Sequence, residues 1–211
     1  MNDLEAIYRE VTSCQGCGLA QTRTHAVPGE GNTTAEIMFV GEGPGFHEDQ
    51  QARPVVGPAG KFLDELLASI GTSRSNVYIT NVLKCRPPGN RDPLPNEVEA
   101  CRPYLLRQIE LINPRLIVTL GRFSLAWFFP RDSIGKVHGS LRRLGNRCFF
   151  HVYHPAAALH AGNLRKVIQD DFAKIPAALE KARTLTAENA DATAEPVGAA
   201  ARSSVEQMKL F

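Results

Sequence analysis

The sequence predicts an α/β protein, a three-layer domain in which helices flank a central, mostly parallel sheet of four strands. Two observations predict this class. Short apolar segments rich in β-branched and aromatic residues alternate along the chain with amphipathic segments of helical period. The chain has 211 residues, 43% of them hydrophobic, which is enough to bury one sizeable core but hardly two.

The expected elements alternate from a first helix at residues 3–12 onward. Four strands are expected at residues 36–41, 77–82, 115–120 and 148–153, each rich in β-branched or aromatic residues. Further helices are expected at residues 59–70, 96–112, 121–129 and 163–182. Pro103 lies inside the helix expected at 96–112, so the sequence predicts that this helix is kinked or begins later.

Charge and hydropathy exclude some classes of protein. The formal net charge of +2 is too small to indicate a nucleic-acid partner, so evidence for one must come from local clusters of basic residues. No apolar run approaches the roughly 20 residues of a membrane-spanning helix, and the first residues do not have the pattern of a secretory signal. We therefore expect a soluble, intracellular protein without a membrane partner.

The last part of the chain differs in composition. From about Thr184 it is rich in Thr, Ala, Glu and Asn and has few large apolar residues, which predicts one domain at residues 1–183 and a disordered tail at residues 184–211. Apolar side chains return at residues 207–211, from Gln207 to Phe211. This is chance composition, a small fold-back contact or a short docking peptide. The five residues resemble the peptide by which bacterial polymerases and repair proteins bind the sliding clamp, with Met208 in place of the usual Leu.

Four of the five cysteines form a pattern typical of a metal site. Cys14 and Cys17 are separated by two residues, and Cys85 and Cys101 lie sixteen residues apart in the middle of the chain. A close pair can bind one metal without strain, and the distant pair completes the shell if the fold brings it in. Residue types alone do not distinguish zinc from an iron–sulfur cluster. Cys148 lies in an apolar run and is expected to be a buried core thiol.

Three polar segments follow the expected strands, where ligands bind in sheets of this kind. Gly41, Gly43 and Gly45 form a turn whose spacing is not that of a dinucleotide or phosphate loop, and Glu42 adds a carboxylate. Asn81 offers one donor and one acceptor, which match the amide-like edge of a pyrimidine. His154 offers a donor for a developing oxyanion. Taken singly, each residue is also compatible with a structural role.

Together, these segments resemble the iron–sulfur uracil-DNA glycosylases, the family 4 enzymes of bacteria and archaea. The resemblance covers roughly three quarters of the chain and rests on the cysteine pattern and on motifs at residues 41–45, 53–60, 80–88, 121 and 154–155. It implies a uracil-DNA glycosylase-like fold and a [4Fe–4S] cluster bound by Cys14, Cys17, Cys85 and Cys101. The enzyme is expected to be monofunctional and to leave an abasic site, the first step of base excision repair, because no lysine or N-terminal amine lies at these strand ends in a position to form a Schiff base. A monomer suits an enzyme that scans DNA, and the expected location is a bacterial or archaeal cytosol, at the nucleoid.

The resemblance also implies roles for single residues. His154 would stabilise charge on the uracil O2, Asn81 would recognise the O4 and N3 edge, and Glu42 would position water or favour the cationic sugar. Leu159 would enter the space left by the flipped base. The residues expected to face the DNA backbone are Lys84, Arg86, Arg91 and Arg165, and those expected at the base are Gly41, Gly43, Val55 and Phe46.

One position departs from the family pattern. Between Arg-Pro and Val-Gly the family usually has an aromatic ring on which the flipped base stacks, and this chain has Val55. Stacking of this kind is worth roughly 1–3 kcal/mol per base. Either uracil binds more weakly or Phe46 supplies the missing face. The alternatives to a uracil enzyme are a glycosylase for another deaminated base, such as hypoxanthine or xanthine, and a non-catalytic DNA-binding module with a metal-stabilised loop.

Overall fold

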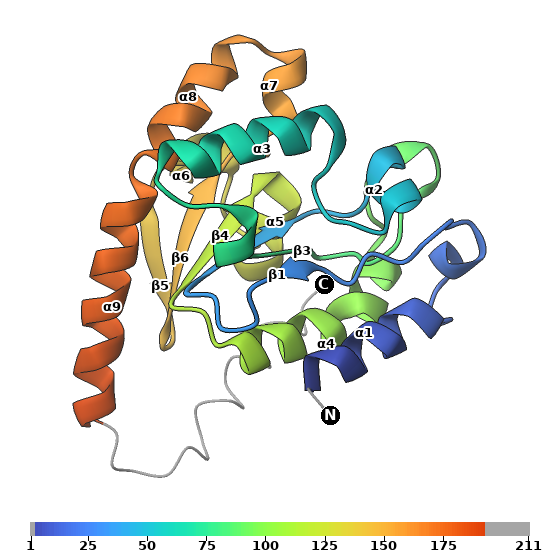
Figure 1. The fold of residues 1–211 in the computed structure, drawn as a ribbon, viewed down its shortest axis with the longest axis horizontal. Coiled ribbons are helices and arrows are strands. Elements are labelled where there is room, and N and C mark those ends of the chain that lie inside the picture. Colours follow the sequence, from blue (N-terminus) through green and yellow to red (C-terminus); the bar gives the residue numbers. More distant parts are fainter. Residues whose placement is uncertain (1–2, 193–211) are drawn as a thin grey trace.

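A computed structural model describes residues 3–192 and contains one six-stranded sheet in the order β1-β3-β2-β4-β6-β5 (Figure 1). The four inner strands are parallel, and the two edge strands pair antiparallel to their neighbours. The strands are β1 (Glu30–Gly31), β2 (Ile37–Gly41), β3 (Tyr78–Asn81), β4 (Leu116–Leu120), β5 (Leu141–Leu144) and β6 (Arg147–Val152).

The four strands expected from the sequence are confirmed within one residue at each end, but the expected number of strands was wrong. The two additional strands lie at the edges of the sheet. Strand β1 has two residues, too few for any alternation to show. Strand β5 contains two arginines, and three of its four residues are exposed, so it lacks the apolar face by which strands are recognised.

The helices are α1 (Asp3–Ser13), α2 (Phe46–Gln51), α3 (Gly57–Ser69), α4 (Pro95–Ile112), α5 (Gly121–Phe128), α6 (Ile134–Val137), α7 (Ala157–His160), α8 (Asn163–Phe172) and α9 (Ile175–Ala192), and the 3-10 turns are η1 (Gly18–Gln21), η2 (Arg74–Asn76) and η3 (Pro88–Asn90). Helix α4 starts with Pro95 in its first turn and continues through Pro103, so a later start was not needed. The helix expected at residues 163–182 is two helices, α8 and α9.

The domain boundary expected at residue 183 falls inside α9, which continues to Ala192. The first nine residues of the expected tail are therefore part of this helix. A helix that is already formed provides the nucleus that a short isolated helix lacks, so it can continue into such a segment. The remainder of the expected tail, with the peptide at residues 207–211, lies outside the described residues.

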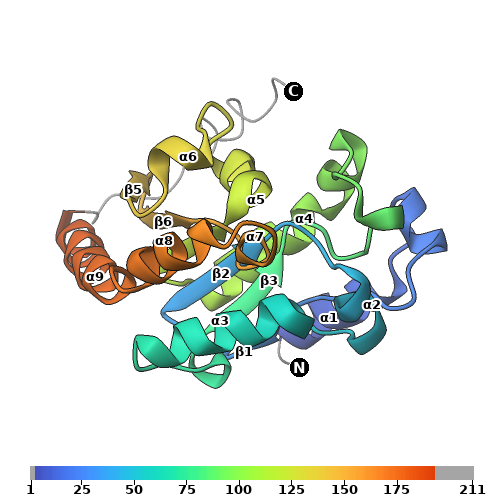
Figure 2. The same ribbon diagram turned by 90° about the horizontal axis from the view of Figure 1, so that it is seen from above.

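Helices cover both faces of the sheet, as the sequence predicts (Figure 2). Helices α1, α4 and α5 pack on one face, where their apolar residues meet Met38, Val40 and Ile117 of the sheet. Helices α3, α8 and α9 pack on the other face against Phe39 and Val118. Alternate residues of each inner strand thus enter two separate cores, which fixes the register of the strands. Within residues 3–192, no helix combines the length and the apolar character that crossing a membrane requires.

Candidate active site and thiol cavity

The carboxyl ends of β3, β2, β4 and β6 lie side by side in the sheet, so the segments that follow them meet at one edge. Gly41 at the end of β2 pairs in register with Asn81 at the end of β3. His154 follows β6 by two residues. The topology therefore brings the polar segments recognised in the sequence to a single edge.

Asn81 and His154 converge on Gly41. A Cβ atom placed on Gly41 would lie 2.4 Å from Asn81 Oδ1 and 3.6 Å from His154 Nε2. Asn81 is 2% exposed, and its Nδ2 is buried without a hydrogen-bond partner. A buried amide donor of this kind costs free energy unless a ligand or water pairs with it. The arrangement is suited to a ligand that presents a hydrogen-bond acceptor to Asn81 Nδ2.

The imidazole of His154 is held in one tautomer. Its Nδ1 accepts a hydrogen bond of 3.1 Å from the Ala156 backbone N–H, so in the neutral ring the proton is on Nε2. Burial lowers the pKa of His154 to about 4, and the ring is neutral above that pH. Gly121 (φ +85°) permits this placement, because a Cβ there would lie 3.1 Å from His154 Cβ. A neutral donor therefore faces the Gly41 turn.

Glu42 follows Gly41 and is half-buried. Burial, and then the nearby Asp92 carboxylate, raises the pKa of Glu42 to about 6, while the Arg122 guanidinium acts in the opposite direction. Arg122 Nη2 donates to both oxygens of Asp92, at 2.7 and 2.8 Å. Because β2 lies between β3 and β4, this ion pair joins the segment after β3 to the segment after β4 beside Glu42. A carboxylate with a raised pKa at such an edge is typical of an acid–base group.

The other residues expected to contact the uracil base lie in different surroundings. Gly43 lies against Leu83, since a Cβ there would be 3.2 Å from Leu83 Cβ. Val55 has φ +49°, is 3% exposed and packs in the core beneath α3. Phe46 is 53% exposed, and the Arg86 guanidinium lies 5.2 Å from the centre of its ring. The structure thus brings Asn81 and His154 together and leaves Val55 and Phe46 with other neighbours.

Lys84 was expected to face the DNA backbone, and this expectation is wrong. The side chain is 1% exposed, and burial lowers its pKa to about 7. Its Nζ donates to Thr80 Oγ1, the Asn81 carbonyl and Gln108 Oε1 at 2.7 to 2.8 Å. Three acceptors satisfy the ammonium group inside the protein. Lys84 therefore holds the end of β3 against α4, directly behind Asn81.

The other expected DNA contacts lie at or near the surface. Arg91 donates to both carboxylate oxygens of Glu97, and Arg165 pairs with Glu65 at 2.5 Å. Arg86 Nε donates to Asn90 Oδ1, and Leu159 on α7 is 48% exposed.

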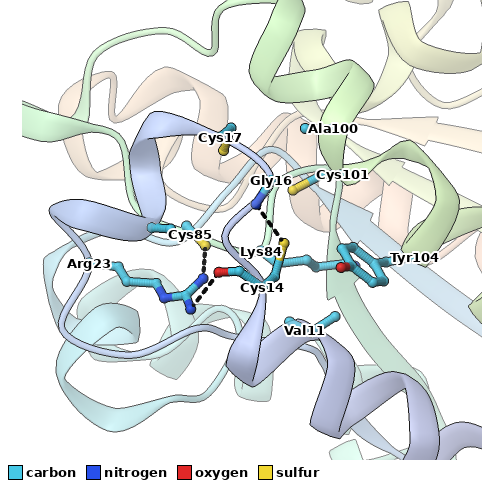
Figure 3. Close-up of a pocket in the computed structure, with 11 residues that line it drawn as sticks. Val11, Cys14, Gly16, Cys17, Arg23, Lys84, Cys85, Ala100, Cys101 and Tyr104 are labelled. Carbon is cyan, nitrogen blue, oxygen red and sulfur yellow. Dashed lines mark hydrogen bonds between the residues drawn. The ribbon is translucent and has the colours of Figure 1, made fainter.

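A second site lies between α1 and α4, where all four cysteines of the predicted metal site line one cavity (Figure 3). Cys14 follows α1 and Cys17 precedes η1, whereas Cys85 follows β3 and Cys101 lies in α4. Cys148 lies in the opposite core, as the sequence predicts. The fold therefore gathers two pairs of thiols that are far apart in the sequence.

The cavity provides donors suited to metal-bound sulfur. The Gly16 N–H donates to Cys14 Sγ at 3.3 Å, and Arg23 Nη1 donates to Cys85 Sγ at 3.0 Å. Burial raises the pKa of Cys85 and that of Cys101, the latter to about 11, so bare thiols here would be neutral and a bound metal would deprotonate them. Among the described residues, no three His, Cys, Asp or Glu side chains converge closely enough to hold a single ion.

Arg23 and the ion pair of Asp92 with Arg122 are further residues of these sites that the sequence pattern did not indicate. Arg23 lies between the cysteine pairs but belongs to no motif. Asp92 and Arg122 are 30 positions apart, and only the sheet order places them together.

The fold and the two sites define a class: an α/β protein with an amide, an imidazole and an acid at adjoining strand ends, and a four-thiol cavity beside them. Residues 28–179 match the family described as the Uracil DNA glycosylase superfamily. The chain is 50% identical over 187 residues to the type-4 uracil-DNA glycosylase of Sulfurisphaera tokodaii, covering 83% of this chain and 84% of the relative.

Two further relatives have the same description. The type-4 uracil-DNA glycosylase of Saccharolobus solfataricus is 49% identical over 199 residues, covering 90% of this chain and 92% of the relative. That of Archaeoglobus fulgidus is 50% identical over 184 residues, covering 83% and 92%. The chain belongs to the type-4 uracil-DNA glycosylases.

Proposed function

We infer that this chain is a uracil-DNA glycosylase, which releases uracil from DNA by hydrolysing its N-glycosidic bond. Family membership supports the reaction. The observation that carries the assignment to this edge of the sheet is the buried Asn81 amide, whose Nδ2 has no hydrogen-bond partner and whose Oδ1 lies at Gly41 together with His154 Nε2. The product would be an abasic site, so the enzyme would act at the first step of base excision repair.

The experiment that tests this function is a panel of oligonucleotides that each contain one modified base. Alkali-sensitive cleavage at uracil is expected, with little at hypoxanthine or xanthine. Preferential cleavage at hypoxanthine or xanthine, or none at any base, would contradict the proposal.

Access to the base requires the uracil nucleotide to leave the duplex, which costs a few kcal/mol. Leu159 is exposed on α7, which follows His154 by only a few residues. An apolar side chain that fills the vacated stack lowers this cost. We assign this role to Leu159.

His154 and Asn81 would act on the flipped base. Cleavage puts negative charge on the uracil, and the neutral His154 donates from Nε2 to O2 as that charge develops. Asn81 Nδ2 donates to O4 and Oδ1 accepts from N3–H, a pattern that cytosine does not match. Both partners are in place before the substrate arrives, because Lys84 holds the Asn81 backbone and Ala156 holds His154.

Glu42 would act as a carboxylate that positions water or stabilises the cationic sugar. Its ionisation should therefore set the acid limb of the pH profile, the range in which kcat/KM falls as the pH is lowered. The pKa of Glu42 is about 6, and activity is expected to fall as the pH drops through that value. Asp92→Asn removes a charge that raises this pKa and should move the limb to lower pH. Arg122→Gln removes a charge that lowers it and should move the limb to higher pH. Profiles of kcat/KM against pH measure both shifts, and equal or same-direction shifts would contradict this assignment.

The thiol cavity would hold a [4Fe–4S] cluster through Cys14, Cys17, Cys85 and Cys101. The residues fit this group, because four thiols from two distant segments surround one cavity and N–H groups point to two of the sulfurs. The resemblance to the iron–sulfur enzymes favours the cluster over zinc. The cluster would fix the segment between β3 and α4 and tie it to the N-terminal cysteine pair.

DNA backbone contacts would come from Arg86, Arg91 and Arg165, with Lys84 removed from the set because it is buried. Arg86 is the contact that we expect to matter most, since its guanidinium stacks on the exposed Phe46 near the glycine turn. Each neutralised phosphate contributes about 0.9 to the slope of log affinity against log salt.

A partner protein is proposed for the segment at residues 207–211, which lies outside the described residues. Its apolar side chains suit a sliding-clamp groove. Removing residues 207–211 should abolish clamp binding, measured by surface plasmon resonance, and leave uracil release from short oligonucleotides unchanged. Clamp binding of equal affinity in the truncated chain would contradict the proposal.

A further inference from the structure

Arg23 joins both cysteine pairs of the thiol cavity. Its Nη1 donates to Cys85 Sγ at 3.0 Å, and its Nη2 donates to the Cys14 carbonyl oxygen at 2.9 Å (Figure 3). Nη2 also donates to the Thr12 carbonyl oxygen at 2.9 Å. Thr12 lies in the last turn of α1, where carbonyl groups lack partners within the helix. One planar cation thus connects the end of α1, the Cys14 segment and the distant Cys85.

The two terminal nitrogens of Arg23 donate to different kinds of acceptor. The hydrogen bonds from Nη2 go to backbone carbonyl groups and hold the main chain in place. The Nη1 bond goes to a sulfur that we assign as an iron ligand. A guanidinium stays charged at every pH of interest, so its bond to a thiolate is charge-assisted and strong. Hydrogen bonds and nearby positive charge at ligand sulfur raise the reduction potential of an iron–sulfur cluster.

The neighbouring groups contribute in other ways. Cys14 Sγ receives the neutral N–H of Gly16. The Lys84 ammonium donates to Thr80, Gln108 and the Asn81 carbonyl, and its charge acts on Cys85 and Cys101 without a hydrogen bond from Nζ to either sulfur. Arg23 therefore places a permanent positive charge at the sulfur of Cys85. Cys85 directly follows Lys84, which holds the backbone of Asn81.

We propose that Arg23 is a positioning residue of the iron–sulfur centre, which holds Cys85 in place for the metal and raises the reduction potential of the cluster. The proposal depends on the [4Fe–4S] assignment made above. It adds a residue that is neither a metal ligand nor part of the catalytic edge. Loss of the Cys85 contact should make the cluster easier to oxidise and quicker to lose iron.

The test uses the full-length protein, purified anaerobically, as Arg23→Gln and Arg23→Lys, with Arg143→Gln as the control. Arg143 is exposed on β5 and donates to the Gly145 carbonyl, so its removal takes away the same charge far from the cavity. Reduction potential is measured by voltammetry, and iron release to a chelator is followed by the loss of visible absorbance. Both readouts are independent of glycosylase activity.

Arg23→Gln should shift the potential to more negative values and release iron about 10–100-fold faster, the change expected when one charge-assisted hydrogen bond is lost. Arg23→Lys keeps the charge without the planar fork and should retain most of the potential but release iron faster than wild type. The Arg23→Lys variant also tests the proposal if Arg23→Gln does not fold.

Two outcomes overturn the proposal in distinguishable ways. If wild-type protein carries iron but both Arg23 variants match Arg143→Gln in potential and iron release, the role of Arg23 is refuted and the cluster assignment stands. If wild-type protein carries zinc or no metal, the cofactor assignment fails and this inference fails with it, whereas uracil release by that protein would leave the proposed reaction intact.

Discussion

Replacing His154 with alanine is expected to lower kcat for uracil release by about 10²–10³-fold, the usual effect of removing one donor from a developing oxyanion. The ring is neutral above a pH of about 4, and its proton is on Nε2 because Nδ1 accepts from Ala156. Its contact with uracil O2 strengthens as charge develops, so the loss should fall on kcat more than on KM. Single-turnover release from a uracil oligonucleotide measures the effect.

The control for this variant is His160→Ala, which removes an exposed imidazole from α7 a few residues away. It should leave kcat unchanged. Equal losses in the two variants would indicate that the segment after β6, rather than the His154 donor, limits the rate. An undiminished kcat in His154→Ala would remove this residue from the active site.

The strands that are buried on both faces could be predicted from the sequence. The two strands at the edges of the sheet could not. Each inner strand is largely apolar, because the two cores receive alternate residues, and this leaves a nearly continuous apolar pattern in the sequence. The edge strand β5 pairs through its backbone, and its side chains Arg142 and Arg143 carry no such signal. The break between α8 and α9 is marked by Pro176 in the first turn of α9, a position that favours the start of a new helix, and the expectation of one helix at residues 163–182 did not take it into account.

The meeting of Asn81 and His154 at one edge of the sheet could be predicted because it depends on strand order and residue type. Asn81 and His154 each follow a recognisable strand, and parallel strands end together. The direction in which a side chain points could not be predicted in the same way. Lys84 lies in a basic stretch of sequence, yet the acceptors that turn it inward come partly from Gln108 on a distant helix. Arg23 is equally inconspicuous, since its role depends on a cavity that four separate segments build.

Replacing Cys85 with alanine is expected to lose the iron of the cluster, about four atoms per chain for a [4Fe–4S] centre, and to lower the melting temperature strongly. Metal binding at a site that exists only in the folded state contributes directly to folding free energy. The N-terminal cysteine pair is tied to the middle of the chain through this site, so α1 should also become accessible to proteases. Iron analysis, thermal unfolding and limited proteolysis measure the three effects.

The matched control is Cys148→Ala, because both thiols are buried, Cys85 at 5% and Cys148 at 1% exposure. Each change removes one sulfur atom from the interior, with a packing cost of about 1 kcal/mol. Only Cys85 lines the thiol cavity, so the difference between the variants isolates the contribution of the metal from that of packing. Equal melting temperatures and equal iron contents would mean that the four thiols are a core cluster and not a ligand set.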